Sequence, residues 1–168
     1  CIMTSDLLCA SPQSISSAAK TIIVKGYKYG SSTFFQYTGA VLAGAKNQPV
    51  LFGKLDGAPS ELPGGWGLSS MRFVTANVNN SNVTAAKLWF NTSNDFSTAT
   101  LKDSIVNPSG LITFNVTGVN NLNLNSVFFF LTFDIAQSGA CDGNLLDAFL
   151  PENALIVSGN TAGIYSVT

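Results

Sequence analysis

Four side chains that could bind a hard cation lie close together in the last third of the sequence. Asp134, Asp142, Asn144 and Asp147 fall within fourteen residues. Ca²⁺ takes about six to eight oxygen ligands from carboxylates, amides and backbone carbonyls, so these residues form a candidate calcium site. Their spacing is not that of an EF-hand, whose loop needs a Gly at its sixth position and a Glu at its twelfth. The structural alternative is that Asp134 and Asp147 accept backbone N–H hydrogen bonds at turns.

The residues that usually carry out catalysis are missing or badly placed. The chain contains no histidine, which removes the commonest metal ligand and general base. Asp56 and Glu61 share a predicted loop, but nothing in the sequence holds them at the separation that a glycosidase needs. Serine is abundant, yet no Gly-x-Ser-x-Gly motif is present. We therefore expect a protein that is not an enzyme and has no cofactor other than the candidate calcium.

Aromatic side chains in predicted loops could bind a sugar ring. Trp66 lies in a Gly-Gly-Trp-Gly segment, and Tyr27 and Tyr29 lie in a polar segment that reads as a turn. Each combines an apolar ring with a polar group, which suits contact with carbohydrate. Trp89 lies in a predicted strand instead, and we expect it in the core. The sequence thus predicts a ligand contact at Trp66, Tyr27 and Tyr29.

The three cysteines leave an odd one if a disulfide forms. A bridge between Cys9 and Cys141 would tie the N-terminal segment to the rest of the protein. The alternative is three free thiols, since no Cys-x-x-Cys spacing exists. The chain also begins at Cys1 rather than Met, which is typical of a processed or excised polypeptide.

Composition narrows the class of protein. Only 10% of the 168 residues are charged and the net charge is −1, whereas soluble domains average about 25% charged residues. A nucleic acid or an anionic membrane is therefore not an expected partner. No apolar run approaches the roughly 18 residues of a membrane-spanning helix. Short apolar segments between Gly, Asn and Ser are typical of a secreted all-β protein, so we expect an extracellular or cell-surface location.

The strongest strand signal is Val127–Ile135, which is aromatic, β-branched and free of Gly and Pro. Alternation divides its side chains between two faces. One face holds Val127, Phe129, Leu131 and Phe133, and the other holds Phe128, Phe130 and Thr132. Because both faces are apolar, we expect this strand at the centre of a sheet and covered on both sides.

About nine short strands with regular turn signals predict an antiparallel β-sandwich, Ig-like or jelly-roll-like, with an N-terminal arm. We expect residues 1–33 to form an arm or linker with one strand, and residues 34–168 to form the sandwich. The local predictions include strands at 21–25 and 34–41, a turn at 26–32, a loop at 56–67, a hairpin of 101–106 with 111–116 around a turn at 107–110, and a turn or short helix at 145–150.

Four segments carry a resemblance to a known family. They are Ala-Gly-Ala-Lys-Asn-Gln at 43–48, Ala-Lys-Leu-Trp-Phe at 86–90, the strand Val127–Ile135, and Gly-Asn-Leu-Leu-Asp-Ala at 143–148. The region from about Val41 to Gly159 resembles the β-sandwich module called the BNR-repeat neuraminidase N-terminal domain. That module also occurs, without a sialidase, in large multidomain surface and secreted proteins of Bacteroidota. Two departures stand out: Phe129-Phe130 replaces an aromatic-Trp pair, and Cys141 lies inside the loop before Asn144.

The resemblance implies a non-catalytic role, because the module precedes the catalytic propeller in sialidases and no propeller fits in this chain. It also bears on glycosylation. Asp103-Ser104-Ile105 is similar to the O-glycosylation motif of that phylum, an Asp followed by Ser or Thr and an aliphatic residue. Asn82, Asn91 and Asn115 each begin an N-glycosylation tripeptide.

Taken together, these features predict a non-catalytic extracellular module of a larger cell-surface or secreted protein, which serves adhesion, carbohydrate contact or assembly. Its expected partners are other domains of the parent chain, neighbouring subunits, or glycans. A hypothesis of a different class is a structural subunit of a surface filament, joined by exchange of a strand or of the N-terminal arm. A fragment of a glycoside hydrolase is the third and least favoured alternative.

Overall fold

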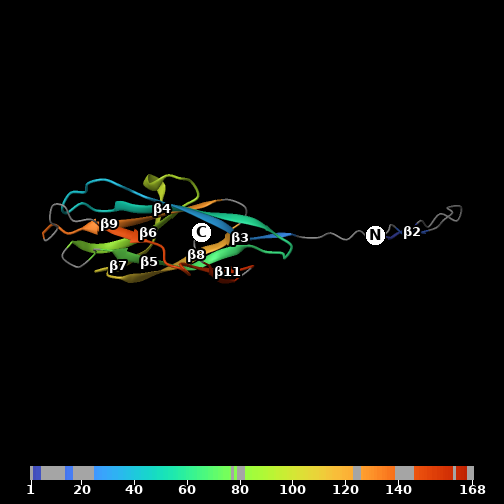
Figure 1. Ribbon diagram of the computed structural model, residues 1–168. Coiled ribbons are helices and arrows are strands. Elements are labelled where there is room, and N and C mark those ends of the chain that lie inside the picture. The colour runs from blue at the N-terminus through green and yellow to red at the C-terminus, as the bar shows by residue number, and fades with distance from the viewer. Residues whose placement is uncertain are drawn as a thin grey trace.

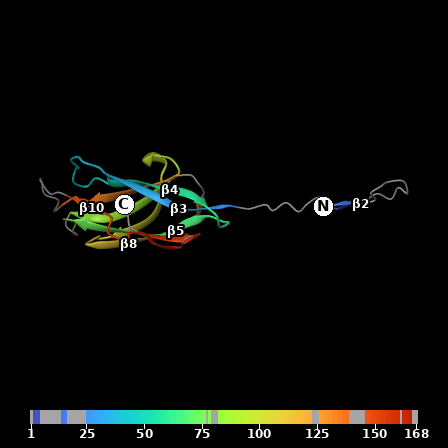
Figure 2. The ribbon, with the colours of Figure 1, turned by 45° about the vertical axis from the view of Figure 1, so that its right-hand side comes forward.

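The computed structural model describes residues 2–4, 14–16, 25–76, 78, 82–122, 126–138, 146–160 and 162–165. Two antiparallel sheets pack face to face, which confirms the predicted all-β sandwich (Figure 1). The two layers stay distinct when the molecule is turned (Figure 2). In the described residues no helix is long and apolar enough to cross a membrane.

The first layer, called here the β9 sheet, has five strands in the order β3-β4-β9-β6-β7. These strands are β3 (Gly26–Gln36), β4 (Gln48–Ser60), β9 (Val127–Ile135), β6 (Val83–Asn91) and β7 (Thr100–Val106). β9 lies at the centre, between β4 and β6, and nearly all its residues are buried on both faces. The prediction of a central, doubly covered strand is therefore confirmed.

The second layer, called here the β5 sheet, is built around β5 (Trp66–Ala76). On one side β5 pairs with β8 (Leu111–Leu122), and on the other it pairs with β11 (Leu155–Gly159) and β10 (Asp147–Phe149). β12 (Gly163–Tyr165) pairs with β11. A short 3-10 helix, η1 (Phe96–Thr98), lies between β6 and β7.

The core lies between the two sheets. From β9 it takes the face that begins with Val127, on which Phe129, Leu131 and Phe133 are fully buried. From the β5 sheet it takes Phe73 and Phe114, and the rings of Phe73 and Phe129 lie 6.3 Å apart across the interface. Burying each such side chain contributes about 1.5–3 kcal/mol, so this face accounts for much of the stability of the sandwich.

Gly53 on β4 allows two large rings to meet. It lies opposite Phe34 of β3 and opposite Phe129 of β9. The two rings contact each other over it, with centroids 5.1 Å apart. A Cβ atom at position 53 would lie 2.3 Å from the Phe129 ring and 2.5 Å from the Phe34 ring, so no larger residue fits without displacing them.

The N-terminal part of the chain differs from the local predictions. β1 (Ile2–Thr4) and β2 (Ser14–Ser16) pair with each other, apart from the two larger sheets in both views (Figures 1 and 2). The turn predicted at 26–32 is wrong, because β3 runs through it and is paired with β4 from Gly26 onward. A shift in register between Tyr29 and Ser31 absorbs the Gly and Ser residues that suggested a turn. Residues 26–33 therefore belong to the same sheet as residues 34–36. Of the strand predicted at 21–25, residues 21–24 lie outside the described residues, and Lys25 is not in a strand.

Four further predictions are corrected. The strand expected at 34–41 ends at Gln36, and the loop expected at 56–67 is short because β4 extends to Ser60 and β5 begins at Trp66. Residues 147–149 form a strand rather than a turn or helix. The hairpin of 101–106 with 111–116 is wrong, because β7 pairs with β6 and β8 pairs with β5. The segment between them is a turn, with positive φ at Asn107 and Gly110, but it carries the chain from one sheet to the other.

Candidate functional site

A row of aromatic side chains crosses the outer face of the β9 sheet, the face turned away from the β5 sheet. Phe35 lies opposite Phe52, Phe52 lies opposite Phe130, and Phe130 lies opposite Trp89. Residues directly opposite each other on neighbouring strands project to the same face. The four side chains therefore form one line across four strands, which we call the aromatic row.

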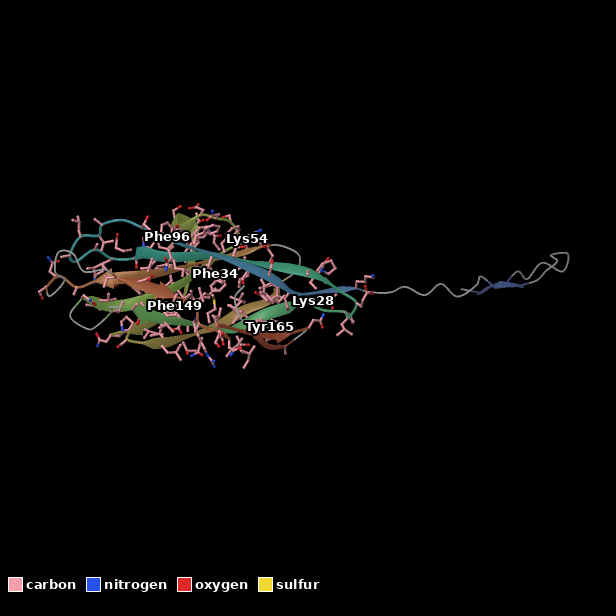
Figure 3. All side chains as sticks on the ribbon, viewed as in Figure 1. Lys28, Phe34, Lys54, Phe96, Phe149 and Tyr165 are labelled. Carbon is pink, nitrogen blue, oxygen red and sulfur yellow. The ribbon has the colours of Figure 1, made fainter. Side chains whose placement is uncertain are left out.

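The rings of the row are in contact with one another. Phe35 stacks on Phe52 with centroids 5.0 Å apart, and Phe52 stacks on Phe130 with centroids 6.0 Å apart. Phe96 of η1 then contacts Phe130 at 5.4 Å and meets Trp89 edge to face at 5.5 Å. In Figure 1 the yellow-green η1 lies over this layer, on the side away from β8 and β11, and Figure 3 labels Phe96 there. This short helix covers the centre of the strand β9 from outside.

Exposure is concentrated at one end of the row. Phe130 is buried, with 1% of its surface exposed, whereas Phe35 is 51% exposed. Tyr37, just after β3, is 47% exposed and its ring lies 6.0 Å from that of half-buried Phe52. We call Phe35, Tyr37 and Phe52 the exposed platform. Apolar rings of this kind, one with a hydroxyl group, can stack on the apolar face of a sugar and donate a hydrogen bond.

Polar side chains follow the aromatic row on the same face. The Trp89 indole N–H donates to Thr132 Oγ1 at 2.9 Å, and Lys87 lies directly opposite Thr132. Lys87 Nζ donates to Asn47 Oδ1 at 2.8 Å and forms an ion pair with Asp134 Oδ2 at 2.9 Å. The three partners, Thr132, Asn47 and Asp134, join the β3–β4 loop and β9 to Trp89 and Lys87 of β6.

Asp134 is held ionised by its neighbours. Burial raises the pKa of its carboxyl group, but the Asn47 backbone N–H, which donates at 2.9 Å, and the Lys87 ammonium lower the pKa more. Lys46, at 3.8 Å, lowers it further, and the net pKa lies below the ordinary value. Asp134 therefore acts as a structural acceptor that ties residues 46 and 47 to the central strand.

The candidate calcium ligands are not brought together among the described residues. Asp134 is committed to Lys87 and Asn47 on the outer face of the β9 sheet. Asp147 begins β10 in the other sheet, where its Oδ1 accepts from Gln36 Nε2 at 2.7 Å. Within the part of the chain that the structure describes, no group of three or more His, Cys, Asp or Glu side chains could hold a metal ion. Asp142 and Asn144 lie outside that part, so calcium binding stays a prediction.

The aromatic residues proposed from sequence lie inside the sandwich. Trp66 is fully buried, because β5 begins at this residue, and its indole N–H has no hydrogen-bond partner. Tyr29 packs edge to face against Trp66 at 5.6 Å and donates to Ser32 Oγ at 2.9 Å. Burial raises the pKa of Tyr29, and Tyr27 also packs against the core. The prediction of a surface contact at Trp66 is therefore wrong, and half-buried Trp89 belongs to the outer face rather than to the core.

Each of the two carboxylates considered for catalysis, Asp56 and Glu61, forms an ion pair with a different lysine. Asp56 lies within β4, where Lys54 Nζ contacts it at 2.8 Å and Ser126 Oγ donates to it at 2.6 Å. Burial raises the pKa of Asp56, but these donors lower it more, so the net pKa lies below the ordinary value. Glu61 pairs with exposed Lys25 at 2.7 Å. These two carboxylates are thus not arranged as an acid–base pair.

The candidate glycosylation sites differ in accessibility. Ser104 on β7 and Asn115 on β8 are exposed. Asn82 is only 3% exposed. Asn91 uses its amide nitrogen to donate to the Asp95 carbonyl at 2.6 Å and to Thr98 at 2.8 Å. Attachment of a glycan to the folded chain is therefore compatible with Ser104 and Asn115 and is opposed by the environment of Asn82. The cysteines proposed to pair, Cys9 and Cys141, lie outside the described residues.

Sequence reasoning missed Phe35 and Phe52. Successive side chains of a strand point to opposite faces, so an extended segment at 34–37 places Phe35 and Tyr37 on one face and Phe34 and Gln36 on the other. This pattern could have predicted that Phe35 and Tyr37 lie side by side. Membership of Phe52 and Phe130 in the same row depends on the register of three strands, which no local pattern specifies.

No family model matches this chain, and no curated protein matches it either. The resemblance to the neuraminidase-associated module stays a prediction. A functional proposal therefore depends on the geometry of the β9 sheet and its edge.

Proposed function

We propose that this chain is a non-catalytic, extracellular carbohydrate-contacting module of a larger surface or secreted protein, and that it binds glycans through the exposed platform. The observation that carries the proposal is the platform itself, in which two half-exposed rings, Phe35 and Tyr37, flank Phe52 on a flat sheet face. Exposed aromatic rings held side by side are costly in water unless a ligand or partner covers them.

The chemistry of the surroundings favours a neutral glycan. The platform itself carries no charge. The charged groups on the same face are paired: Lys54, two residues along β4 from Phe52, contacts Asp56 at 2.8 Å, and Lys87 contacts Asp134 at 2.9 Å. A ligand that depended on charge would find no unpaired cation in these two pairs. Apolar ring faces together with hydroxyl groups, which neutral sugars offer, match a surface of aromatic rings that carries the Tyr37 hydroxyl group.

The rigidity of the site also supports binding. Phe35 is stacked on Phe52, and Phe52 is stacked in turn on buried Phe130. The rings are therefore positioned before any ligand arrives. Binding to a pre-positioned surface loses less conformational entropy than binding that must order side chains first.

A glycan array that holds neutral and sialylated oligosaccharides tests the proposal. Phe35→Ser and Tyr37→Ser together remove both exposed rings and leave the buried half of the row intact. Both rings are already about half-buried, so covering the rest of each contributes about half of the 1.5–3 kcal/mol of a full burial. The double variant should therefore bind neutral glycans roughly tenfold to a hundredfold more weakly. Leu111→Ser is the matched control, because Leu111 is an exposed apolar residue on the β5 sheet.

Two results would contradict the proposal. One is a wild-type chain that binds no glycan on the array. The other is a double variant that binds as tightly as the wild type while the Leu111→Ser control behaves normally, since the contact would then lie elsewhere on the molecule.

Assembly into a filament is a second candidate function, and one observation favours it. Among the described residues, β3 is an edge strand of eleven residues that pairs with the strand β4, and at its N-terminal end the Tyr27 N–H also donates to the Gly64 carbonyl at 2.8 Å. The rest of such an edge can accept a strand from another chain.

A further inference from the structure

Within the part of the chain that the structure describes, no strand lies beside the C-terminal half of β3 on the side away from β4. The Tyr37 N–H donates to the Val50 carbonyl at 2.9 Å, which marks positions 37 and 50 as a hydrogen-bonded pair. Hydrogen-bonded and non-hydrogen-bonded pairs alternate along an antiparallel ladder. The regular register of Phe34 to Gln36 with β4 therefore turns the backbone N–H and C=O groups of Phe34 and Gln36 away from β4, toward the open edge.

An apolar cleft opens beside this edge. It has a volume of about 250 Å³ and lies between the edge of the β9 sheet and the edge of the β5 sheet. Its lining residues are Phe34, Phe35, Gln36, Leu51, Phe149 and Leu150. Figure 3 shows Phe34 in one layer and Phe149 in the other. Phe149 is 46% exposed, so an apolar surface of the cleft is left uncovered.

The edge and the cleft together fit one kind of occupant. A strand added to β3 would receive hydrogen bonds from Phe34 and Gln36, and alternate side chains of that strand would point between the sheets into the cleft. No charged residue lines the cleft. The occupant must therefore be extended, with uncharged apolar side chains at alternate positions.

Residues 21–24 of the chain have this character. Their sequence is Thr-Ile-Ile-Val, the most β-branched apolar run that precedes the sandwich, and it lies outside the described residues. The same chain cannot place this segment in its own cleft. Phe34 is eight residues along β3 from Gly26, about 26 Å at a rise of about 3.3 Å per residue. Thr21 is five residues before Gly26 and reaches at most about 18 Å from it.

We infer that residues 21–24 of one copy pair with the β3 edge of a second copy, with Ile22 and Val24 or their neighbours in the Phe34–Phe149 cleft. Each copy would then offer one donor segment and one acceptor edge. Such a head-to-tail contact does not use the same surface twice, so copies that are joined by it in one direction form a chain of subunits. The inference deepens the filament alternative; its donor residues lie outside the exposed platform, whereas Phe35 belongs both to the platform and to the lining of the cleft.

A complementation experiment on the full chain tests the inference. The donor variant carries Ile22→Asp and Val24→Asp, which introduce charges that the cleft cannot solvate. The acceptor variant carries Gln36→Pro, which removes one N–H at the open edge and is compatible with an edge strand. Gln36→Ala is the matched control, because it loses the same side-chain bonds to Asp147 and Ala148 but keeps the backbone N–H. Circular dichroism checks that each variant is folded, and Phe149→Asp serves as a second acceptor variant.

Sedimentation velocity from micromolar to submillimolar concentration gives the readout. The wild type and Gln36→Ala should exceed twice the chain mass of 17.6 kDa as concentration rises. Each defective variant alone should remain a monomer. A mixture of donor and acceptor variants should form a one-to-one dimer and nothing larger, because only one productive contact remains.

The inference is overturned by a wild type that stays monomeric throughout, by defective variants that associate alone, or by a mixture that fails to form the dimer. Tyr37→Ser should associate like the wild type, and the donor variant should keep the glycan binding of the wild type. These two controls separate failure of the assembly contact from failure of the proposed carbohydrate site.

Discussion

Phe35 of β3 lies nearly parallel to Phe52 of β4, with ring centroids 5.0 Å apart and planes inclined by 16°. The stack exists because the two residues are directly opposite in the ladder. Phe52 therefore supports the exposed ring from inside the sheet, although it is itself only half-buried.

Replacement of Phe52 tests whether this support matters. Phe52→Leu keeps an apolar side chain but removes the flat surface under Phe35, so the exposed ring loses its fixed orientation. We expect the affinity for the glycan that binds best on the array to fall by about threefold to tenfold, with little change in the melting temperature of the protein. Isothermal titration calorimetry measures the affinity. Unchanged affinity would show that Phe35 needs no supporting ring.

The ion pair of Lys87 with Asp134 should stabilise the sandwich measurably. Asp134→Asn keeps an acceptor for the Asn47 N–H but removes the charge that faces Lys87. Because Asp134 is 7% exposed, we expect the free energy of unfolding to fall by about 1–3 kcal/mol. Chemical denaturation measures it. Glu61→Gln is the control, since the pair of Glu61 with Lys25 is exposed and such pairs contribute little; equal losses in the two variants would contradict the account.

Acidification should destabilise the protein through the same carboxylates. The folded-state pKa values of Asp134 and Asp56 are lowered, since the burial that raises them is outweighed by their donors. Their contribution to stability is complete above the unfolded-state pKa of about 3.9 and is lost as the pH falls through the folded-state values. Denaturation midpoints measured from neutral pH to pH 2 should therefore decline below about pH 4. The fall of the denaturation midpoint with decreasing pH should be shallower in Asp134→Asn than in the wild type. The same slope in both proteins would show that Asp134 does not contribute to the loss of stability in acid.

Gly53 should tolerate no side chain. Gly53→Ala places a Cβ atom within 2.3 Å of the Phe129 ring, which must move in a close-packed core. We expect a loss of about 1–3 kcal/mol. Gly163→Ala is the matched control, because its Cβ atom would meet nothing closer than 3.4 Å. Thermal unfolding compares the two, and a neutral Gly53→Ala would mean that the core is less tightly packed than the ring contacts indicate.

Parts of this architecture follow from local sequence, and parts do not. The central position of β9 is predictable because both of its faces are apolar. The turn at 107–110 is predictable from its Asn, Pro and Gly, but the passage of the chain to the other sheet depends on which strands β7 and β8 pair with. Trp66 illustrates the same limit: its Gly-rich surroundings suggest a loop, yet the pairing of β5 with β8 and β11 begins at this residue and buries it.

The candidate site was hidden from local patterns for a related reason. The exposed platform unites residues from β3, the segment after it, and β4, and these become neighbours only through strand register. Asp134 could be predicted as an acceptor of backbone N–H groups. Its ion pair with Lys87, 47 positions away in the sequence, could not.

A nuclear magnetic resonance titration of the full chain with the neutral glycan that binds best on the array would locate the binding site residue by residue. We expect the ring protons of Phe35 and Tyr37 to shift first and most, with smaller shifts at Phe52 and at Asn47. Shifts confined to the β5 sheet, or to Trp66 and its neighbours, would contradict this expectation and would move the binding site to the other side of the sandwich.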